Sequence, residues 1–425
     1  MKFLLLVLLT LSGLTVAKVF QVPLVKVESN MVQMIRKGTW PAYLKKMKAR
    51  RLDLNLDGKG TYHTDAYDIH DMEYMANITI GNPEQSFLVV PDTGSADFWV
   101  IDHLCSAGSP PVCLQSKCDP GKVCTAFCPD KSCCKRKRVG PGEACKGKHF
   151  FDERKSTTYS EIPGRWSIFY GTGDATGFYG NDTVRIGGSG DDRLTIPGCK
   201  IGQAEVIAPF FATHKTEGVL GLAFSKLSSN PVAPVFERAF TLGLVDPVFT
   251  VYFKSMGYQS NGDVGGVFTF GGLDTEHCGD VIAYEKLTQT SFWQFKLRGV
   301  KAGQFSSQVG WEVFSDTGAS LIAAPVEVAN RITKELNATY NPDTELYYVN
   351  CYSKPSITLT IGENDYTIEA ENLVIKINED RCLLALFDFA PFIGPTWVLS
   401  DPFIRQYCNI HDMGQKAIGF AKAKK

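Results

Sequence analysis

Short runs rich in β-branched and aromatic residues recur along the chain from residue 66 onward. Glycine, proline, asparagine or aspartate bounds each run, which is typical of strands that end in turns. Helical periodicity is sparse, and its best examples are residues 230–243 and 325–337. The pattern therefore predicts a mainly β protein with few short helices. The expected strands lie at residues 74–81, 86–91, 97–101, 166–171, 182–188, 247–253, 265–272 and 356–362.

The N-terminal end departs from this pattern. Residues 1–17 place Lys2 before an apolar run and end with the small residues Thr15 and Ala17 near the boundary, as a secretory signal peptide does. The run is too short to span a bilayer comfortably, and no later stretch of about 18 apolar residues follows it. We therefore expect a secreted chain with no membrane segment.

Charge is distributed unevenly, although the net charge is only −1. Residues 18–60 contain ten Lys or Arg and three acids, whereas the chain after residue 60 carries 33 basic and 42 acidic residues. A basic head on an acidic body indicates an electrostatic clamp that weakens when carboxylates become protonated. A basic linker or nucleic-acid arm is the alternative, but interleaved apolar residues favour short amphipathic helices that pack on the body. We expect no nucleic-acid partner.

Length and cysteine content define the organisation further. A chain of 425 residues predicts two domains or lobes. Its thirteen cysteines indicate disulfides in a secreted protein, and the odd number leaves at least one unpaired in the monomer that we expect. Eight of them lie within residues 102–150, which predicts a disulfide-stapled surface insert without regular structure. A zinc site is the alternative there, but clean C-x₂-C pairs are missing.

Three sequons are candidate glycosylation sites if they are exposed. They begin at Asn77, Asn181 and Asn337.

The tripeptide Asp-Thr-Gly occurs twice, at residues 92–94 and 316–318. Each copy follows apolar residues, so its aspartate is expected at a strand end, where threonine fixes the turn and glycine allows close approach of two loops. If one copy belongs to each lobe, Asp92 and Asp316 face each other and share one proton. An acid and a base then flank one water, and no metal or cofactor is required.

Together with other motifs, the repeated Asp-Thr-Gly resembles the pepsin family of aspartic endopeptidases over nearly the whole chain. IFYGTGDATGFYGNDTVRIGG (168–188) is similar to the family's flap hairpin, and GVLGLAF (218–224) to the apolar support of the first catalytic loop. FTFGGLD (268–274) and WVLSDPFIRQY (397–407) match later landmarks. The resemblance implies a bilobal pepsin-like fold with an interlobe cleft.

The resemblance also implies a zymogen. Its expected parts are a signal peptide at 1–17, a basic propeptide at 18–60, an N-terminal lobe at 61–272 containing the cysteine-rich insert at 102–150, and a C-terminal lobe at 273–425. Inserts of this kind resemble those of nematode digestive aspartic proteases. The implied activity is cleavage of protein or peptide substrates at acidic pH, next to hydrophobic residues. The implied location is outside the cell or in a lysosomal or acidic extracellular compartment.

Site residues are carried over motif by motif. Asp92 and Asp316 are the implied catalytic dyad, and Ser95 is expected to hydrogen-bond near Asp92. Tyr170 is expected on the flap, with Trp99 beneath it as a packing partner. The other implied substrate-binding positions are Gly94, Gly171, Thr172, Gly318 and Ala319.

Two further sets of residues come from looser matches. Phe210, Phe211 and Val219 line an apolar side-chain pocket or simply belong to the core, and both interpretations stay open. Cys351 and Cys382 match a family disulfide.

Three positions depart from the family pattern. Ala319 stands where many members have threonine, and Asp97 where pepsin-like members often have asparagine. Both changes disfavour ionisation of the dyad, which predicts an activity optimum less acidic than that of pepsin. Ser400 replaces a usual glycine and is expected to crowd the loop under Asp316. The alternative function is therefore a catalytically silent peptide-binding protein on the same fold.

The propeptide is expected to block the site as an internal partner. Alignment on MIRKG (34–38) places Lys48 between the dyad carboxylates, where its ammonium plugs the site at neutral pH. The alternatives are that Lys45 or Lys46 takes this place, or that Lys48 is an ordinary surface lysine. Other enzyme classes lack support. GEACKGKH (142–149) misses the final Ser or Thr of a phosphate loop, and neither H-E-x-x-H nor G-x-S-x-G occurs.

Overall fold

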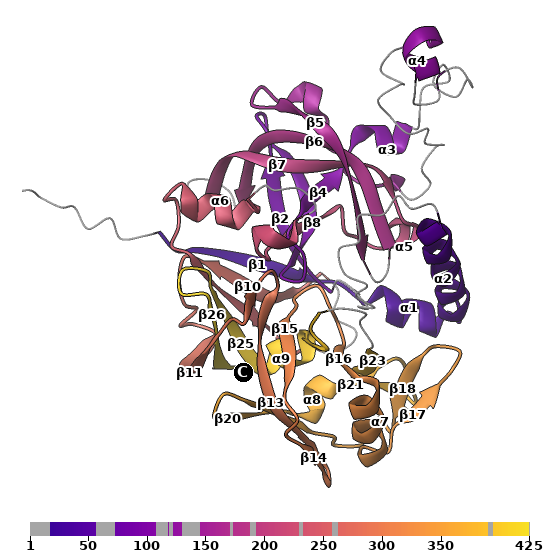
Figure 1. Cartoon of the computed structure of the whole chain (residues 1–425), viewed down its shortest axis with the longest axis vertical. Coiled ribbons are helices and arrows are strands. Elements are labelled where there is room, and N and C mark those ends of the chain that lie inside the picture. The colour runs from indigo at the N-terminus through magenta and orange to yellow at the C-terminus, as the bar shows by residue number, and fades with distance from the viewer. Residues whose placement is uncertain are drawn as a thin grey trace, which may run out of the picture.

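The chain folds into two halves that lie on either side of a shared sheet, as the computed structural model shows (Figure 1). The N-terminal half, from indigo to magenta, forms the upper part of the view, and the C-terminal half, from orange to yellow, forms the lower part. The structure describes residues 18–56, 73–107, 118, 122–129, 145–170, 173–187, 193–228, 233–256, 262–389 and 394–424. The predicted signal peptide lies outside these residues.

A 13-stranded sheet runs through the molecule in the order β11-β26-β25-β9-β10-β1-β2-β3-β8-β4-β7-β6-β5. Its strands are β1 (Phe20–Lys26), β2 (Tyr74–Ile80), β3 (Gln85–Asp92), β4 (Phe98–Ile101), β5 (Ser160–Tyr170), β6 (Gly173–Ile186), β7 (Leu194–Ile207), β8 (Gly218–Gly221), β9 (Val248–Phe253), β10 (Val264–Phe270), β11 (Cys278–Lys286), β25 (Tyr407–Asp412) and β26 (Ala417–Ala423). Because β11, β25 and β26 come from the C-terminal half, hydrogen bonding continues from one half into the other.

The C-terminal half adds a nine-stranded and a four-stranded sheet. The nine-stranded sheet contains β12 (Gln289–Thr290), β13 (Trp293–Ala302), β14 (Phe305–Ser307), β15 (Trp311–Ser315), β16 (Ile322–Pro325), β19 (Ile357–Ile361), β20 (Asn364–Ile368), β23 (Leu386–Phe389) and β24 (Trp397–Leu399). The four-stranded sheet contains β17 (Thr339–Asn341), β18 (Leu346–Val349), β21 (Val374–Lys376) and β22 (Cys382–Leu384).

The helices are α1 (Asn30–Arg36), α2 (Trp40–Leu56), α3 (His103–Ala107), α4 (Lys122–Phe127), α5 (Pro209–Thr213), α6 (Val235–Thr241), α7 (Val326–Glu335), α8 (Ala370–Leu373) and α9 (Asp401–Gln406), with 3₁₀ turns η5 (Glu153–Lys155) and η7 (Ser225–Leu227). Most helices are short, and α2 and α4 lie at the edge of the molecule in Figure 1. Both helices predicted from sequence, α6 and α7, are confirmed. Within the described residues, no helix combines the length and the apolar character needed to cross a bilayer.

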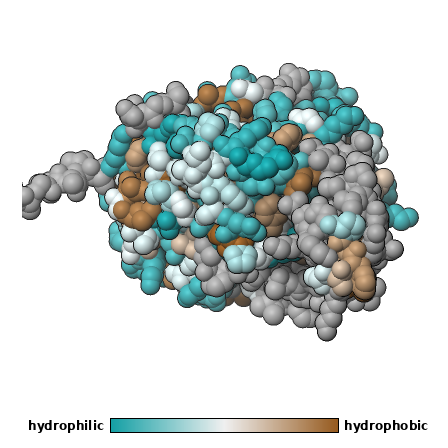
Figure 2. Space-filling view, turned by 90° about the horizontal axis from the view of Figure 1, so that it is seen from above, coloured by the Kyte–Doolittle hydropathy of each residue, from teal (hydrophilic) through white to brown (hydrophobic). Residues whose placement is uncertain are grey.

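The core follows from alternation along the strands. In β19, for example, Ile357, Leu359 and Ile361 are fully buried, while the threonines between them are partly exposed. The largest apolar cluster joins residues of both halves, including Phe87 and Trp293. The face seen in Figure 2 is mostly hydrophilic, with hydrophobic side chains in small separate groups. All eight predicted strands are present, so the mainly β prediction is confirmed.

Three local predictions were incomplete or wrong. β1 was not predicted, although its burial alternates strictly until its last residues and it pairs with both β10 and β2. α2 has 17 residues and is longer than the short helix expected there. The insert contains α3 and α4, where no regular structure was expected, because short helical turns carry several of its cysteines.

Disulfides account for most of the described cysteines. The predicted Cys351–Cys382 bridge is present, and Cys278 pairs with Cys408. Two bridges, Cys105–Cys145 and Cys118–Cys128, lie in the insert. Cys199 is buried and unpaired, as the odd cysteine count requires of at least one residue.

Candidate active site

Each Asp-Thr-Gly loop follows a strand that pairs in parallel with a second, apolar strand. Asp92 ends β3 opposite Gly221 of β8, and Asp316 follows β15, which pairs with β24. The main chain closes both loops against these supports. The Leu222 amide donates to the Asp92 carbonyl at 2.7 Å, and the Asp316 amide donates to the Leu399 carbonyl at 2.9 Å.

Four hydrogen bonds between Thr93 and Thr317 and the opposite loop join the two halves. Each threonine amide donates to the hydroxyl of the other threonine at 3.0 Å. The Thr93 hydroxyl donates to the Ser315 carbonyl at 3.0 Å, and the Thr317 hydroxyl to the Pro91 carbonyl at 2.7 Å. Both threonines are buried, so the contacts are protected from water and fix one loop relative to the other. The sequence predicted turn-stabilising hydroxyls, but not that they reach across to the opposite loop.

The aspartate side chains of both Asp-Thr-Gly loops lie next to Gly94. The Gly94 amide donates to Oδ1 of Asp92 at 2.9 Å, and the Gly318 amide donates to Oδ1 of Asp316 at 2.8 Å. A Cβ atom on Gly94 would lie 2.7 Å from Oδ1 of Asp316, so only glycine permits the Asp316 carboxylate to approach this loop. Both aspartates are about 1% exposed. Such a pair supplies one acid and one base, the arrangement established for aspartic proteases.

The two loops differ at one hydroxyl. The Ser95 hydroxyl donates to Oδ2 of Asp92, as predicted. Ala319 occupies the corresponding position after Gly318 and is also buried, but it offers no donor to Asp316. Asp92 therefore accepts a hydrogen bond from Ser95, and residue 319 cannot donate the equivalent hydrogen bond to Asp316.

The predicted flap aromatic, Tyr170, lies near Asp92. Tyr170 ends β5, and its hydroxyl accepts a 2.7 Å hydrogen bond from the Trp99 indole nitrogen. Phe211 packs edge-on against both rings. Burial, reinforced by the negative charge of Asp92, raises the pKa of Tyr170 well above its usual value. The Trp99 contact is confirmed as a hydrogen bond as well as packing, while Gly171 and Thr172 lie outside the described residues.

The apolar candidates lie beside this flap residue. Phe210, Phe211 and Val219 are fully buried in the same cluster as Tyr170 and Trp99. Their burial in this structure fits a core role, and their contacts with the flap also fit a pocket wall. Phe210 additionally packs on Tyr43 of α2, with ring centroids 6.0 Å apart.

Of the other two departures from the family pattern, the side chain of Asp97 has a hydrogen-bond partner, whereas the buried hydroxyl of Ser400 has none. Oδ1 of Asp97 accepts a 2.8 Å hydrogen bond from the Ser228 hydroxyl. Ser400 is buried directly before α9, and the neighbouring hydrogen bond between the Asp316 amide and the Leu399 carbonyl is intact. Asn77 and Asn337 are exposed, whereas Asn181 is partly buried, so the first two sequons are the more accessible.

The predicted lysine plug at Lys48 is wrong. The Lys48 ammonium pairs with Glu345, and both side chains are well exposed. The error arises because the alignment fixed a position along α2 but not the face on which that position falls. The residue that sequence reasoning missed is Tyr43, which packs against apolar clusters of both halves and stacks on Trp40 at 5.5 Å.

A buried charged group at the end of β1 was also missed. Lys26 pairs with Glu73, and Arg405 lies 3.9 Å from Glu73 and 3.7 Å from Asp401. Burial opposes protonation of Lys26, but Glu73 outweighs it and raises the pKa of Lys26 above its usual value. Burial, followed by the charge of Glu73, raises the pKa of Asp401 well above its usual value. The lysine at the end of a hydrophobic alternation was the available sequence signal.

Comparisons with known proteins agree with this geometry. The family described as eukaryotic aspartyl protease matches residues 73–423. Aspartic protease 2 of Necator americanus is 48% identical over 422 residues, which cover 99% of each chain. Aspartic protease 6 of Caenorhabditis elegans is 38% identical over 98% of each chain, and mouse (Mus musculus) cathepsin E is 31% identical over 83% of this chain and 81% of its own. The family match over most of the chain and the similarity to these relatives show that the chain belongs to the eukaryotic aspartyl protease family and is an aspartic-type endopeptidase of the pepsin kind.

Proposed function

We propose that the protein is a secreted zymogen that becomes active in acid and cleaves peptide bonds next to hydrophobic residues. The catalytic step is attack of a water molecule on the peptide carbonyl. One dyad carboxylate accepts a proton from that water, and the other, protonated carboxylic acid donates a proton to the substrate. Asp92 and Asp316 carry this step, and Tyr170 closes over the bound peptide.

The observation that carries the proposal is the position of residues 18–56 across both halves. Asn30 donates to the Phe210 carbonyl at 3.4 Å on the N-terminal side. Trp40 donates through its indole nitrogen to the Thr344 carbonyl at 3.0 Å on the C-terminal side. Tyr43 packs between clusters of both sides. A segment that bridges the two halves beside the flap residue's cluster obstructs a peptide that must lie between them.

Acid release is supported by the charge of this segment. Arg36 pairs with Glu28 at its surface, whereas the Lys26–Glu73 pair is buried at the end of β1. Loss of the Glu73 charge would leave the buried Lys26 ammonium without its charge partner, which is strongly unfavourable. Low pH therefore weakens the attachment of β1.

Secretion and side-chain preference are supported by separate features. The N-terminal apolar run has the composition of a signal peptide, and the disulfides of both halves are typical of an oxidising compartment. The aromatic residues packed on Tyr170 offer apolar surface for a substrate side chain.

The proposal is tested with the purified full-length chain and a quenched-fluorescent peptide whose scissile bond is flanked by hydrophobic residues. We expect loss of residues 18–56 and peptide cleavage at pH 4, with little of either at pH 7.5. Asp92→Asn should reduce turnover by at least about a hundredfold, because it removes one member of the acid–base pair. Equal cleavage by the intact chain at both pH values would contradict the zymogen proposal.

A matched peptide with polar residues at the scissile bond tests the specificity. It should be cleaved more slowly than the hydrophobic peptide by the acid-treated enzyme. Equal rates for both peptides would reject the hydrophobic preference while leaving the zymogen proposal intact.

A further inference from the structure

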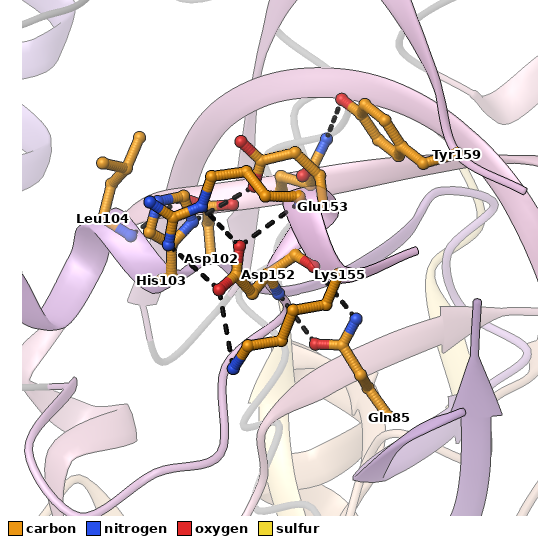
Figure 3. Close-up of polar contacts among 10 residues, drawn as sticks. Gln85, Asp102, His103, Leu104, Asp152, Glu153, Lys155 and Tyr159 are labelled. Carbon is orange, nitrogen blue, oxygen red and sulfur yellow. Dashed lines mark hydrogen bonds and ion pairs between the residues drawn. The ribbon is translucent and has the colours of Figure 1, made fainter. Parts of the chain in front are cut away.

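The two ends of the cysteine-rich insert meet at a polar cluster that the catalytic site does not use. Asp102 follows β4 and forms an isolated parallel bridge with Phe151, and His103 begins α3. The His103 amide donates to the Phe151 carbonyl at 3.0 Å, and the Phe151 amide donates to the Ile101 carbonyl at 2.8 Å. The main chain thereby places Asp102 and His103 beside Glu153 of η5 (Figure 3).

Asp102, His103 and Glu153 are the one group of three potential metal ligands found in the described part of the chain. One donor atom from each residue lies within 4.8 Å of the other two. Nδ1 of His103 is 3.4 Å from Oδ1 of Asp102 and 3.1 Å from Oε2 of Glu153. Ligand atoms that bind a tetrahedral zinc ion at about 2.0–2.1 Å lie about 3.3 Å from one another, and both separations fit this value.

A second observation is the unsatisfied oxygen of Asp102. This side chain is 0% exposed, and the Leu104 amide donates to its Oδ1 at 2.9 Å. Its Oδ2 has no hydrogen-bond partner. A buried carboxylate oxygen without a partner is costly, and a cation bound at Oδ2 would offset this cost.

The basic residues next to the cluster are directed to a different carboxylate. Arg154 donates to Asp152 through Nε at 2.7 Å and through Nη2 at 2.9 Å. The Lys155 ammonium lies 3.6 Å from Oδ2 of the same aspartate (Figure 3). Arg154 and Lys155 therefore pair with Asp152, which lies next to the cluster of Asp102, His103 and Glu153.

We propose that Asp102, His103 and Glu153 form a binding site for a divalent transition-metal ion, with zinc as the best fit to one imidazole and two carboxylate ligands. The side chains of His103 and Glu153 are 12% and 19% exposed, so the ion has a path from solvent. A bound ion ties the end of β4 to η5. Together with the Cys105–Cys145 bridge, it closes the base of the insert.

The test is zinc titration of the chelator-dialysed, full-length Asp92→Asn protein against a chromophoric chelator at pH 7.5. We expect one zinc equivalent that is lost in His103→Ala and at least tenfold weaker in Glu153→Gln. His149→Ala is the matched control, because His149 is 78% exposed and pairs with Glu217 instead. Excess calcium should not displace the zinc, since calcium prefers oxygen ligands.

Absence of zinc binding, or unchanged binding in His103→Ala, would overturn the proposal. X-ray absorption at the zinc edge of the protein with its ligands unaltered gives a second readout that does not depend on the folding of a variant. A nitrogen and oxygen shell is expected. A sulfur shell would place the ion on cysteines and would equally reject the site.

Discussion

The hydroxyl of Ser95 distinguishes two catalytic loops that are otherwise built alike. Both aspartates accept a hydrogen bond from the amide of the glycine two positions later. Asp92 also accepts one from the hydroxyl of Ser95, whereas the corresponding residue after Gly318 is Ala319, which has no hydroxyl. A donor at a carboxylate favours its ionised form. The identity of residue 319 is therefore expected to set the acid side of the activity profile.

Ala319→Thr should move the acid limb of the pH profile of kcat/KM downward, by on the order of half to one pH unit. The introduced hydroxyl can donate to Asp316 as Ser95 does to Asp92. Ala319→Val is the matched control, because valine has the shape of threonine without a donor. An unmoved limb in Ala319→Thr, or an equal shift in both variants, would contradict this explanation.

Contacts between residues were predictable where a motif fixes both the residue and its neighbours. The contact of Ser95 with Asp92 was predicted from the Asp-Thr-Gly loop in this way, and the contact of Trp99 with Tyr170 from the flap motif. The prediction for Lys48 was wrong because the position of its side chain depends on the orientation of the whole helix α2. The local sequence pattern does not determine that orientation.

At the scale of elements, the strands were the most predictable feature. β9 and β19 combine β-branched and aromatic residues with clear turn signals at their ends. β1 was overlooked because Pro23, at an exposed position of the alternation, weakens the local strand signal and because basic residues dominate its surroundings. Pairing on both sides with β10 and β2 overrides these weak local signals, which is a tertiary effect.

β25 carries a buried histidine that makes the fold sensitive to acid. His411 stacks on Phe249 at 4.6 Å and meets Trp293 edge-on at 4.7 Å. Burial lowers the pKa of His411 to about 3. Between pH 6.5 and about 3, the unfolded imidazole takes up a proton that the folded one does not. Stability is therefore lost as pH falls, by about 1.4 kcal/mol for each pH unit in this window.

His411→Phe should remove this dependence. The difference in the free energy of unfolding between pH 7.5 and pH 4.5 should shrink by about 3 kcal/mol, measured by urea unfolding in the inactive Asp92→Asn background. His149→Phe changes an exposed ring and serves as the control. If His411→Phe keeps the same pH dependence of stability as the parent and as His149→Phe, the titration of His411 does not govern acid stability.

At the scale of the whole molecule, the N-terminal segment is integrated into the sheet that both halves share. β1 lies between β10 and β2, and its last residue enters the buried charged group around Glu73. Removal of one partner from a buried ion pair costs about 3–5 kcal/mol, whereas an exposed pair contributes at most about 1 kcal/mol. The Lys26–Glu73 pair is therefore expected to control release more strongly than the exposed Arg36–Glu28 pair.

Glu73→Gln should raise the pH at which half of the full-length chain is processed in a fixed time. Gel analysis of the chain after incubation across a pH series measures this midpoint. Glu28→Gln removes the partner of Arg36 within the same segment and should leave the midpoint nearly unchanged. A larger effect of Glu28→Gln, or none of Glu73→Gln, would show that release is governed elsewhere.

The paired threonine contacts beneath the dyad have a mechanical consequence. Four hydrogen bonds between buried groups hold the two Asp-Thr-Gly loops rigidly together. The two halves cannot separate at this point without breaking these hydrogen bonds. Room for an incoming peptide is therefore expected to come from movement of the β5–β6 hairpin, whose Tyr170 contacts Trp99 and Phe211. Compounds that bind the closed β5–β6 hairpin should therefore dissociate more slowly than compounds that contact only the two Asp-Thr-Gly loops.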